Sequence, residues 1–413
     1  MENINLKTYY MVIKILGDFV NNKIIDKDFF NENIIDVANE ENSQKIYIGR
    51  IYYIAKKHNL VSIMAQAMEK LGFESDSDIW KRWLKEKNQL IYKSVLMDVE
   101  REAIQDFFEK NNIWYMLLKG MVIRKYYPAP ELREMADNDI LFDNKYSKEV
   151  YEFMTARGYK SDDYNKGYHD EYLKPPAYNF EMHRQLVSSK ERPKWYEYYK
   201  DVKSILIKDT NENRETAANN ESNNTSNQFY FSDNDFYVYF IVHTYKHFLN
   251  SGMGLRTVLD VYLYVSNLQE KLDFDYIEEQ LKKLDAYDFE QTFRSIAFKM
   301  FDENLEDRKW WDLFDVKEQE MLSYVLDAGT YGNLENSVAH KMGNTKGEKK
   351  KTSDKARYIF RRLFPSMDTI EEFFPFFYKH KWAIPFLYIY RIGKIPFTRR
   401  KKVAGELKEV FKK

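Results

Sequence analysis

Three acidic residues in the middle of the chain have the types and spacing of a metal site. Asp137 and Asp139 open a short apolar segment, and Glu181 and His183 alternate with apolar residues in a second one. Because successive side chains of a strand point to opposite faces, Asp137 and Asp139 share one face of their strand, and Glu181 and His183 share one face of theirs. Carboxylate oxygens suit Mg²⁺ and Mn²⁺. If the two strands are neighbours, the sequence predicts that Asp137, Asp139 and Glu181 together hold one or two divalent cations.

The elements that must position these residues are short and apolar. A strand-like run ends at Gly120, and a short helix and a loop with two prolines follow, since proline cannot continue a helix. The acidic residues then lie in the second and third of three predicted strands, which span 113–118, 137–142 and about 178–186.

Helical periodicity dominates the rest of the chain, so we expect an α+β fold. A small mixed β-sheet core would be flanked by helical N- and C-terminal regions. Two polar, charged segments are typical of flexible linkers. The expected organisation is a helical N-terminal region at 1–110, the core at 111–209, a linker at 210–228, a helical domain at 229–343, a second linker at 344–355 and a helical, basic C-terminal region at 356–413.

The charge of the chain disfavours one class of partner. The formal net charge is −1, so a long nucleic acid is not the expected partner. Residues 379–413 nevertheless carry 11 Lys or Arg against two Glu. This basic tail is typical of a solvated helix end, and the functional alternatives are a peripheral contact with an anionic membrane or with nucleic acid.

The chain contains no cysteine, which excludes disulfides, a thiol nucleophile and cysteine-based zinc sites. The first 20 residues lack a basic segment followed by an apolar one, and no stretch of about 18 residues is free of charge. We therefore expect a soluble, cytoplasmic protein.

Two histidine motifs allow other interpretations. His243 and His247 lie four residues apart on a predicted helix, a spacing that could bind zinc, but no third ligand accompanies them. Packing within the helix is the simpler interpretation, and a nucleotide-facing role together with Lys246 is the functional one. His169-Asp170 resembles the metal dyad of phosphohydrolases, but we expect this segment to be a loop.

Several motifs together resemble a known family. The chain is similar to the uncharacterised nucleotidyltransferases of the polymerase-beta-like superfamily over roughly residues 75–400. The motifs that carry the resemblance are Leu118-Lys119-Gly120, Tyr127-Pro128, Leu132-Arg133, Asp137-x-Asp139, Glu181-x-His183, His243-x-x-Lys246-His247-Phe248, Leu255-Arg256 with Asp260, and Arg361-Arg362-Leu363-Phe364-Pro365.

The resemblance implies an enzyme that moves an NMP group from an NTP to a hydroxyl acceptor and releases pyrophosphate, with Mg²⁺ or Mn²⁺ as cofactor. The acceptor would be a sugar, a small molecule, a protein or an RNA. Asp137, Asp139 and Glu181 would be the catalytic, metal-binding residues. The residues implied to bind the nucleotide are Lys119, Gly120, Arg133, His183, Lys246 and His247.

Two positions depart from the superfamily pattern. Met121 stands where a serine usually follows the glycine, so phosphate binding would rely on backbone N–H groups at the helix start and on Lys119 or Arg133. Asn138 replaces an apolar residue between the two aspartates, so it needs buried partners or marks an altered sheet. Both departures favour the alternative of a catalytically inactive member that acts as a nucleotide-binding or partner-binding module.

Overall fold

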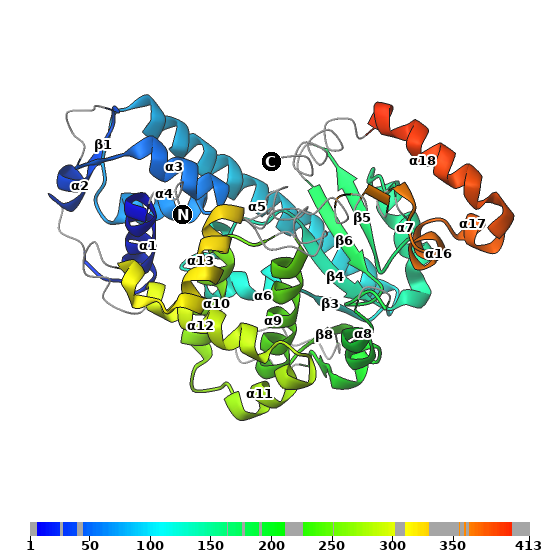
Figure 1. Cartoon of the computed structure of the whole chain (residues 1–413). Coiled ribbons are helices and arrows are strands. Elements are labelled where there is room, and N and C mark those ends of the chain that lie inside the picture. Colours follow the sequence, from blue (N-terminus) through cyan, green and yellow to red (C-terminus); the bar gives the residue numbers. More distant parts are fainter. Residues whose placement is uncertain are drawn as a thin grey trace. The chain divides into compact units, whose positions relative to one another are not determined.

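A six-stranded mixed sheet lies in the larger of two units into which the chain divides (Figure 1). The structure is a computed structural model, and it describes residues 6–24, 28–38, 44–162, 164–175, 178–189, 192–210, 226–250, 252–301, 310–329, 355, 359–360 and 363–398. The larger unit comprises Met1–Val242 and Gly254–Leu326, and the smaller one comprises His243–Met253 and Asp327–Lys413.

The strand order of the sheet is β5-β6-β4-β3-β8-β7. β4 runs parallel to β6 and β3 parallel to β8, whereas β3 pairs with β4, β5 with β6 and β7 with β8 in antiparallel fashion. This mixed sheet, surrounded by helices, confirms the α+β expectation. The strands span Tyr115–Leu117 (β3), Asn138–Phe142 (β4), His169–Lys174 (β5), Tyr178–His183 (β6), Ile207–Lys208 (β7) and Gln228–Tyr230 (β8), and a separate parallel pair is formed by Ile34–Ile35 (β1) and Ile46–Tyr47 (β2).

One face of the sheet is covered by apolar packing. Ile140 and Phe142 of β4 and Phe180 and Met182 of β6 are buried in one cluster with Phe108, which lies on α5 (Asp78–Lys110). α7 (Ser147–Ala156) contributes to the same cluster. Burying a side chain of this size stabilises the fold by about 1.5–3 kcal/mol. The alternating residues between these positions, Asp139 and Glu181 among them, therefore point to the opposite face.

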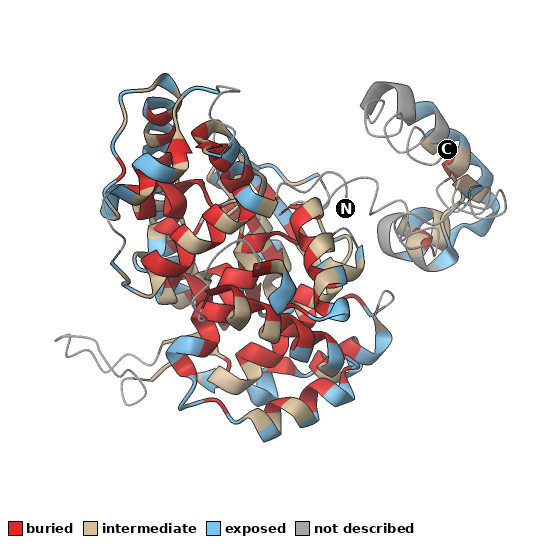
Figure 2. Ribbon diagram, turned by 60° about the vertical axis from the view of Figure 1, so that its left-hand side comes forward, coloured by how far each residue is buried: buried red, intermediate tan, exposed pale blue. Residues whose placement is uncertain are grey.

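The helices of the larger unit pack around this sheet and against one another, and their buried residues are concentrated in its interior (Figure 2). α1 contacts α3, α4 and α12, so segments far apart in the sequence share a core. The helices lying wholly in this unit include α1 (Leu6–Val20), α2 (Asp28–Asn33), α3 (Ile48–Lys57), α4 (Val61–Lys70), α5, α6 (Gly120–Ile123), α7, α8 (Pro193–Tyr199), α10 (Leu255–Leu268), α11 (Phe274–Lys283) and α12 (Tyr287–Phe301).

A buried histidine joins three of these helices. The Tyr9 hydroxyl on α1 is 3.0 Å from His58 Nε2 at the end of α3, and His58 Nδ1 accepts a hydrogen bond from the Leu255 N–H at the start of α10. Both ring nitrogens of His58 therefore have partners inside the protein. Burial lowers the pKa of His58 to about 3, so the folded protein contains it as a neutral imidazole.

The smaller unit is helical where the structure describes it. α16 (Met367–Phe373), α17 (Pro375–Lys379) and α18 (Ile384–Thr398) follow one another, and α9 (Asp233–Asn250) and α13 (Val316–Ala328) run from the larger unit into the smaller one. Within the described residues, no helix is both long and apolar enough to cross a bilayer. Most of the two predicted linkers, the motif residues Arg361 and Arg362, and residues 399–413 of the basic tail lie outside the described residues.

Candidate active site

The strand pairing brings two of the three predicted acidic residues, Asp139 and Glu181, to one place. β4 and β6 are parallel neighbours, and Asp139 is the register partner of Glu181. The predicted site required these two strands to be neighbours, and this pairing meets that condition. β5 pairs with the other edge of β6, where His169 lies opposite His183. Two carboxylates and two imidazoles thus lie side by side on three adjacent strands.

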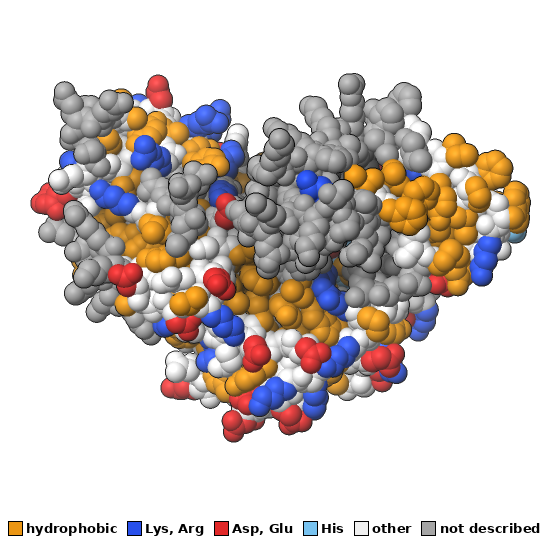
Figure 3. All heavy atoms as spheres, in the orientation of Figure 1, with side chains coloured by type: hydrophobic (Ala, Val, Ile, Leu, Met, Phe, Trp, Pro, Cys, Tyr) orange, Lys and Arg blue, Asp and Glu red, His pale blue; other side chains and the backbone are white. Residues whose placement is uncertain are grey.

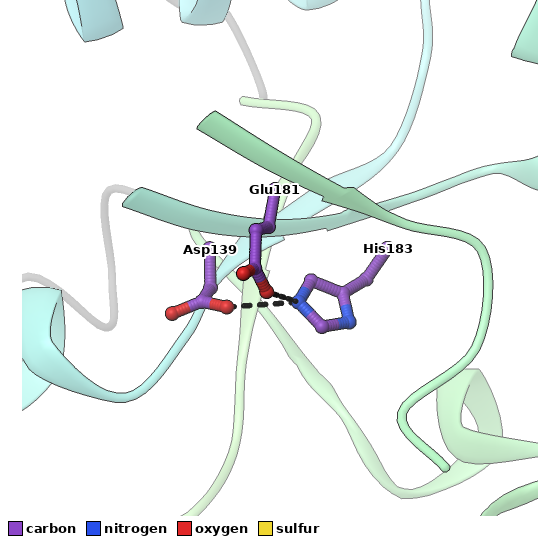
Figure 4. A group of neighbouring side chains, drawn as sticks. All are labelled: Asp139, Glu181 and His183. Atoms are coloured by element: carbon purple, nitrogen blue, oxygen red, sulfur yellow. Dashed lines mark hydrogen bonds and ion pairs between the residues drawn. The ribbon is translucent and has the colours of Figure 1, made fainter. Parts of the chain in front are cut away.

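Asp139, Glu181 and His183 form the group that could hold a metal ion (Figure 4). His183 Nε2 is 2.8 Å from Asp139 Oδ1 and 3.4 Å from Glu181 Oε2, and one ligand atom of each residue lies within 4.8 Å of the others. Asp139 and His183 are buried, and Glu181 is half-buried. It is the only such group of three among the residues that the structure describes.

Asp137 precedes β4 and belongs to the same charged neighbourhood. Burial, followed by repulsion from Asp139, raises the pKa of Asp137 to about 6. Burial would also raise the pKa of Asp139, but Lys119 and His183 outweigh it and hold that pKa well below its usual range. The two aspartates thus differ because Lys119 and His183 both contact Asp139 directly.

Lys119 lies at the turn between β3 and α6. Its Nζ donates to Asp139 Oδ1 at 2.6 Å, and its side chain is 16% exposed. Its backbone has φ 46° and ψ −111°, and the Met121 N–H donates to the Leu118 carbonyl at 3.1 Å. This is the geometry of a type II′ turn, whose second residue is usually glycine. A lysine in such a conformation costs about 1–3 kcal/mol, a strain that is typical of functional sites.

Gly120 lies against the guanidinium group of Arg133. A Cβ at Gly120 would be 2.4 Å from Arg133 Nη1, so only glycine allows this contact. The Nε and Nη2 atoms of Arg133 donate to the two carboxylate oxygens of buried Asp260, each at 2.8 Å, and the Tyr127 hydroxyl donates to the same carboxylate at 2.7 Å. Arg133 therefore connects the glycine turn to α10, and its implied role as a nucleotide ligand stays a prediction.

The His169-Asp170 segment is a strand and not the loop that we expected. The proline-containing sequence after it suggested a loop, but pairing with β6 makes it β5. His169 Nε2 is 3.8 Å from Glu181 Oε2, and its ring stacks on that of His183 with centroids 5.0 Å apart. Asp170 instead accepts from Arg184 and from the Asn165 N–H. The two residues have different surroundings and form no dyad.

Two tyrosines near the site were not predicted from the sequence. The ring of Tyr168 lies 5.9 Å from that of His183. Tyr239, buried on α9, is close enough to Lys119 and Asp139 for their charges to act on its hydroxyl, although burial is the main reason that its pKa is raised. With 33 tyrosines in the chain, nothing in the sequence distinguishes these two.

Asn138 lies on the opposite face of β4, toward α5. It is buried, Arg101 Nη1 on α5 lies 3.5 Å from its Oδ1, and its Nδ2 has no partner among the described residues. It lines a cavity of about 20 Å³ together with Met97 and Asp98, which is room for about one water molecule. The strand pairing is regular at this position, so Asn138 does not alter the sheet.

The remaining predicted nucleotide ligands belong to the smaller unit. Lys246 and His247 lie on α9, where His247 Nε2 is 2.8 Å from His243 Nε2. Each histidine thus has the other as a close neighbour on the same helix. Their role toward a nucleotide stays a prediction.

Comparison with known proteins agrees with this geometry. Residues 44–302, more than half of the 413-residue chain, match the family described as uncharacterised nucleotidyltransferase. No curated protein and no solved structure gave a match. The match includes the glycine turn, both aspartates, and Glu181 and His183, so the chain belongs to the uncharacterised nucleotidyltransferase family and is by that membership a transferase.

Proposed function

We propose that this protein is a metal-dependent nucleotidyltransferase that moves an NMP group from an NTP to a hydroxyl acceptor and releases pyrophosphate. One observation carries the proposal: Asp139 and Glu181 are register partners on adjacent parallel strands, beside a strained glycine turn. Family membership supports the NTP as substrate.

The residues present fit a divalent cation. Asp139, Glu181 and His183 offer two carboxylates and one imidazole within 4.8 Å of one another, and Asp137 adds a third carboxylate nearby. Oxygen donors suit Mg²⁺ and Mn²⁺, and the imidazole favours Mn²⁺ of the two. When bound there, the cation would neutralise the charge that develops on the phosphates.

The protein's own groups would orient the nucleotide. The N–H groups of Met121, Val122 and Ile123 all donate to the carbonyls of Leu118 or Lys119 within the turn. Phosphate binding therefore depends more on the Lys119 ammonium group than on the backbone. The acceptor oxygen would bond to the α-phosphorus as the bond from that phosphorus to pyrophosphate breaks, and the hydroxyl proton would pass to a carboxylate of the cluster.

The acceptor that we propose is a hydroxyl of a sugar, a small molecule or a protein. The net charge of −1 disfavours a long nucleic acid. Met121 and Asn138 are the features that favour the alternative, an inactive protein that binds a nucleotide or a partner. Against that alternative, Asn138 leaves the pairing of β4 with β6 regular.

Pyrophosphate release distinguishes the two functions. The wild-type protein is incubated with each NTP, Mg²⁺ or Mn²⁺ and a panel of hydroxyl acceptors, beside Asp139→Asn, Glu181→Gln and the control Glu149→Gln, whose carboxylate is exposed on α7. Release that persists in the control and is lost in both site variants supports the enzyme. Nucleotide binding without release under any condition supports the inactive module instead.

A second proposal concerns the smaller unit, in which several aromatic residues are exposed. Phe376, Trp382, Phe386, Ile389 and Tyr390 are each more than half exposed on α17, η8 (Lys381–Ala383) and α18, and Figure 3 shows hydrophobic side chains gathered there. The sequence from 374 to 398 contains cations but no Asp or Glu. Exposed aromatics beside cations fit the headgroup region of an anionic membrane, so we propose a peripheral membrane contact at this surface.

Vesicle flotation tests this contact. The wild-type protein should float with vesicles that contain phosphatidylserine and not with pure phosphatidylcholine, and the double variant Trp382→Ser, Phe386→Ser should stay behind. Equal behaviour of the variant and the wild-type protein would contradict the proposal. So would a concentration-dependent dimer that the double variant abolishes, because the surface would then bind a second copy of the chain.

A further inference from the structure

We propose that the Lys119 ammonium group and a divalent cation compete for Asp139, so that Lys119 weakens metal binding until a nucleotide draws it onto its phosphates. The inference rests on the proposed function. It adds a coupling between the two ligands, in which the nucleotide must arrive for the metal to bind tightly.

The first observation is that one oxygen of Asp139 is fully engaged. Asp139 Oδ1 accepts from Lys119 Nζ at 2.6 Å and also faces His183 Nε2 at 2.8 Å. Both contacts are short, charge-assisted bonds. A cation that coordinates this oxygen must displace one of these two partners, because each partner already occupies one lone pair of the oxygen. The ammonium group is the partner that a metal cation repels most strongly.

The second observation is that the chain holds Lys119 in this place at a cost. Its φ of 46° lies in the region that favours glycine, yet two backbone hydrogen bonds hold the turn in this conformation. The Met121 N–H donates to the Leu118 carbonyl, and the Leu118 N–H donates to the Asp139 carbonyl at 3.0 Å. The backbone beside Lys119 is thus hydrogen-bonded to Asp139, the residue that the Lys119 side chain contacts. Chance placement of the side chain is therefore a poor explanation of the contact.

The third observation is the charge balance. Lys119 is close enough to act electrostatically on Asp137, Asp139 and Glu181 together, and its ammonium group contacts Asp139 directly. The interaction of an ammonium with these carboxylates offsets the repulsion that a metal would otherwise relieve. In the nucleotide-free protein the site should therefore bind a divalent cation more weakly. A triphosphate supplies new negative charge to which the flexible lysine side chain can turn.

The two ligands should respond to the loss of Lys119 in opposite directions. Removing the ammonium group should tighten Mn²⁺ binding without nucleotide by at least about tenfold, and it should weaken NTP binding by a similar factor. A lysine that only supports the fold would weaken both. Lys119→Arg keeps the charge and should leave Mn²⁺ binding close to that of the wild-type protein.

The experiment is a Mn²⁺ titration followed by electron paramagnetic resonance, with and without a non-hydrolysable NTP. Lys119→Met removes the charge, and Lys119→Gly removes it while also suiting the backbone conformation, so at least one variant without the ammonium group should fold. Lys125→Met, which removes an exposed lysine of η2 (Arg124–Tyr126), is the matched control. Tighter Mn²⁺ binding and weaker NTP binding in both Lys119 variants, with the control unchanged, is the expected result.

Asp139→Asn separates the two proposals. If this variant loses Mn²⁺ binding but Lys119→Met and Lys119→Gly bind Mn²⁺ no more tightly than the wild-type protein, the competition is overturned and the proposed function stands. If Asp139→Asn binds Mn²⁺ as well as the wild-type protein does, both proposals fail.

Discussion

Replacing Gly120 by alanine tests how the glycine turn is held. The added Cβ would lie 2.4 Å from Arg133 Nη1 and 3.3 Å from Arg133 Cζ, whereas ordinary van der Waals contacts begin at 3.4 Å. The guanidinium group cannot move away freely, since two bonds of 2.8 Å hold it on buried Asp260. Either the turn shifts or the ion pair opens.

The expected loss of stability can be estimated for each of these two outcomes, a shifted turn or an opened ion pair. Forcing extra volume into a packed site costs about 1–3 kcal/mol, and separating a buried ion pair costs about 3–5 kcal/mol. We therefore expect Gly120→Ala to lower the free energy of unfolding by about 2–4 kcal/mol. Because the turn carries Lys119, NTP binding should weaken as well.

Urea unfolding followed by circular dichroism measures the effect. Gly17→Ala is the matched control, because its Cβ would meet the Phe301 carbonyl oxygen at 3.5 Å, an ordinary contact, and alanine favours the helix. In an Arg133→Met background the clash partner is absent, so the cost of Gly120→Ala should fall by at least about 2 kcal/mol. Equal costs in the two backgrounds would refute this explanation of the glycine.

Three further predictions concern buried or half-buried polar groups. His58 is neutral in the folded protein with its pKa lowered to about 3, whereas the unfolded chain protonates it below pH 6.5. The free energy of unfolding should thus fall by about 2 kcal/mol from pH 7 to pH 5 because of His58. Urea titrations of His58→Gln at the two pH values should show a decrease that is smaller by this amount. Asn138→Leu removes an amide nitrogen that has no partner in the described structure, so it should raise the free energy of unfolding by about 1 kcal/mol and leave pyrophosphate release within about threefold of the wild-type rate. Asp98 accepts from Arg101 Nη1 at 2.7 Å and from Arg124 Nη1 at 2.6 Å, so Asp98→Asn should cost about 2 kcal/mol in the same urea assay, and an unchanged midpoint would contradict this.

The alternation of side chains along a strand was the basis for the part of the site that could be predicted from local sequence. The alternation around Glu181 was enough to predict that Glu181 and His183 share a strand face. Asp137 was predicted in the same strand as Asp139, but β4 begins at Asn138, so Asp137 precedes it. The pairing of β4 with β6 then placed Asp139 beside Glu181. The same rule predicted that Asn138 would face the core.

Contacts between distant segments were beyond such reasoning. The bond from Lys119 to Asp139, the ion pair of Arg133 with Asp260 and the approach of Tyr239 on α9 each join residues that are 20 or more positions apart. The His169 strand was missed for a related reason, because its hydrogen bonds to β6 and not its own polar sequence make it a strand. Tertiary pairing, which a single sequence does not display, decided these features.

The central claim is that Asp139 and Glu181 hold a catalytic cation together. Crystals grown with Mn²⁺ and a non-hydrolysable NTP would test it through the anomalous scattering of manganese. We predict an anomalous peak within coordination distance of both carboxylates, with the nucleotide phosphates beside it. A nucleotide-bound structure whose manganese lies elsewhere, or that shows none, would contradict the claim.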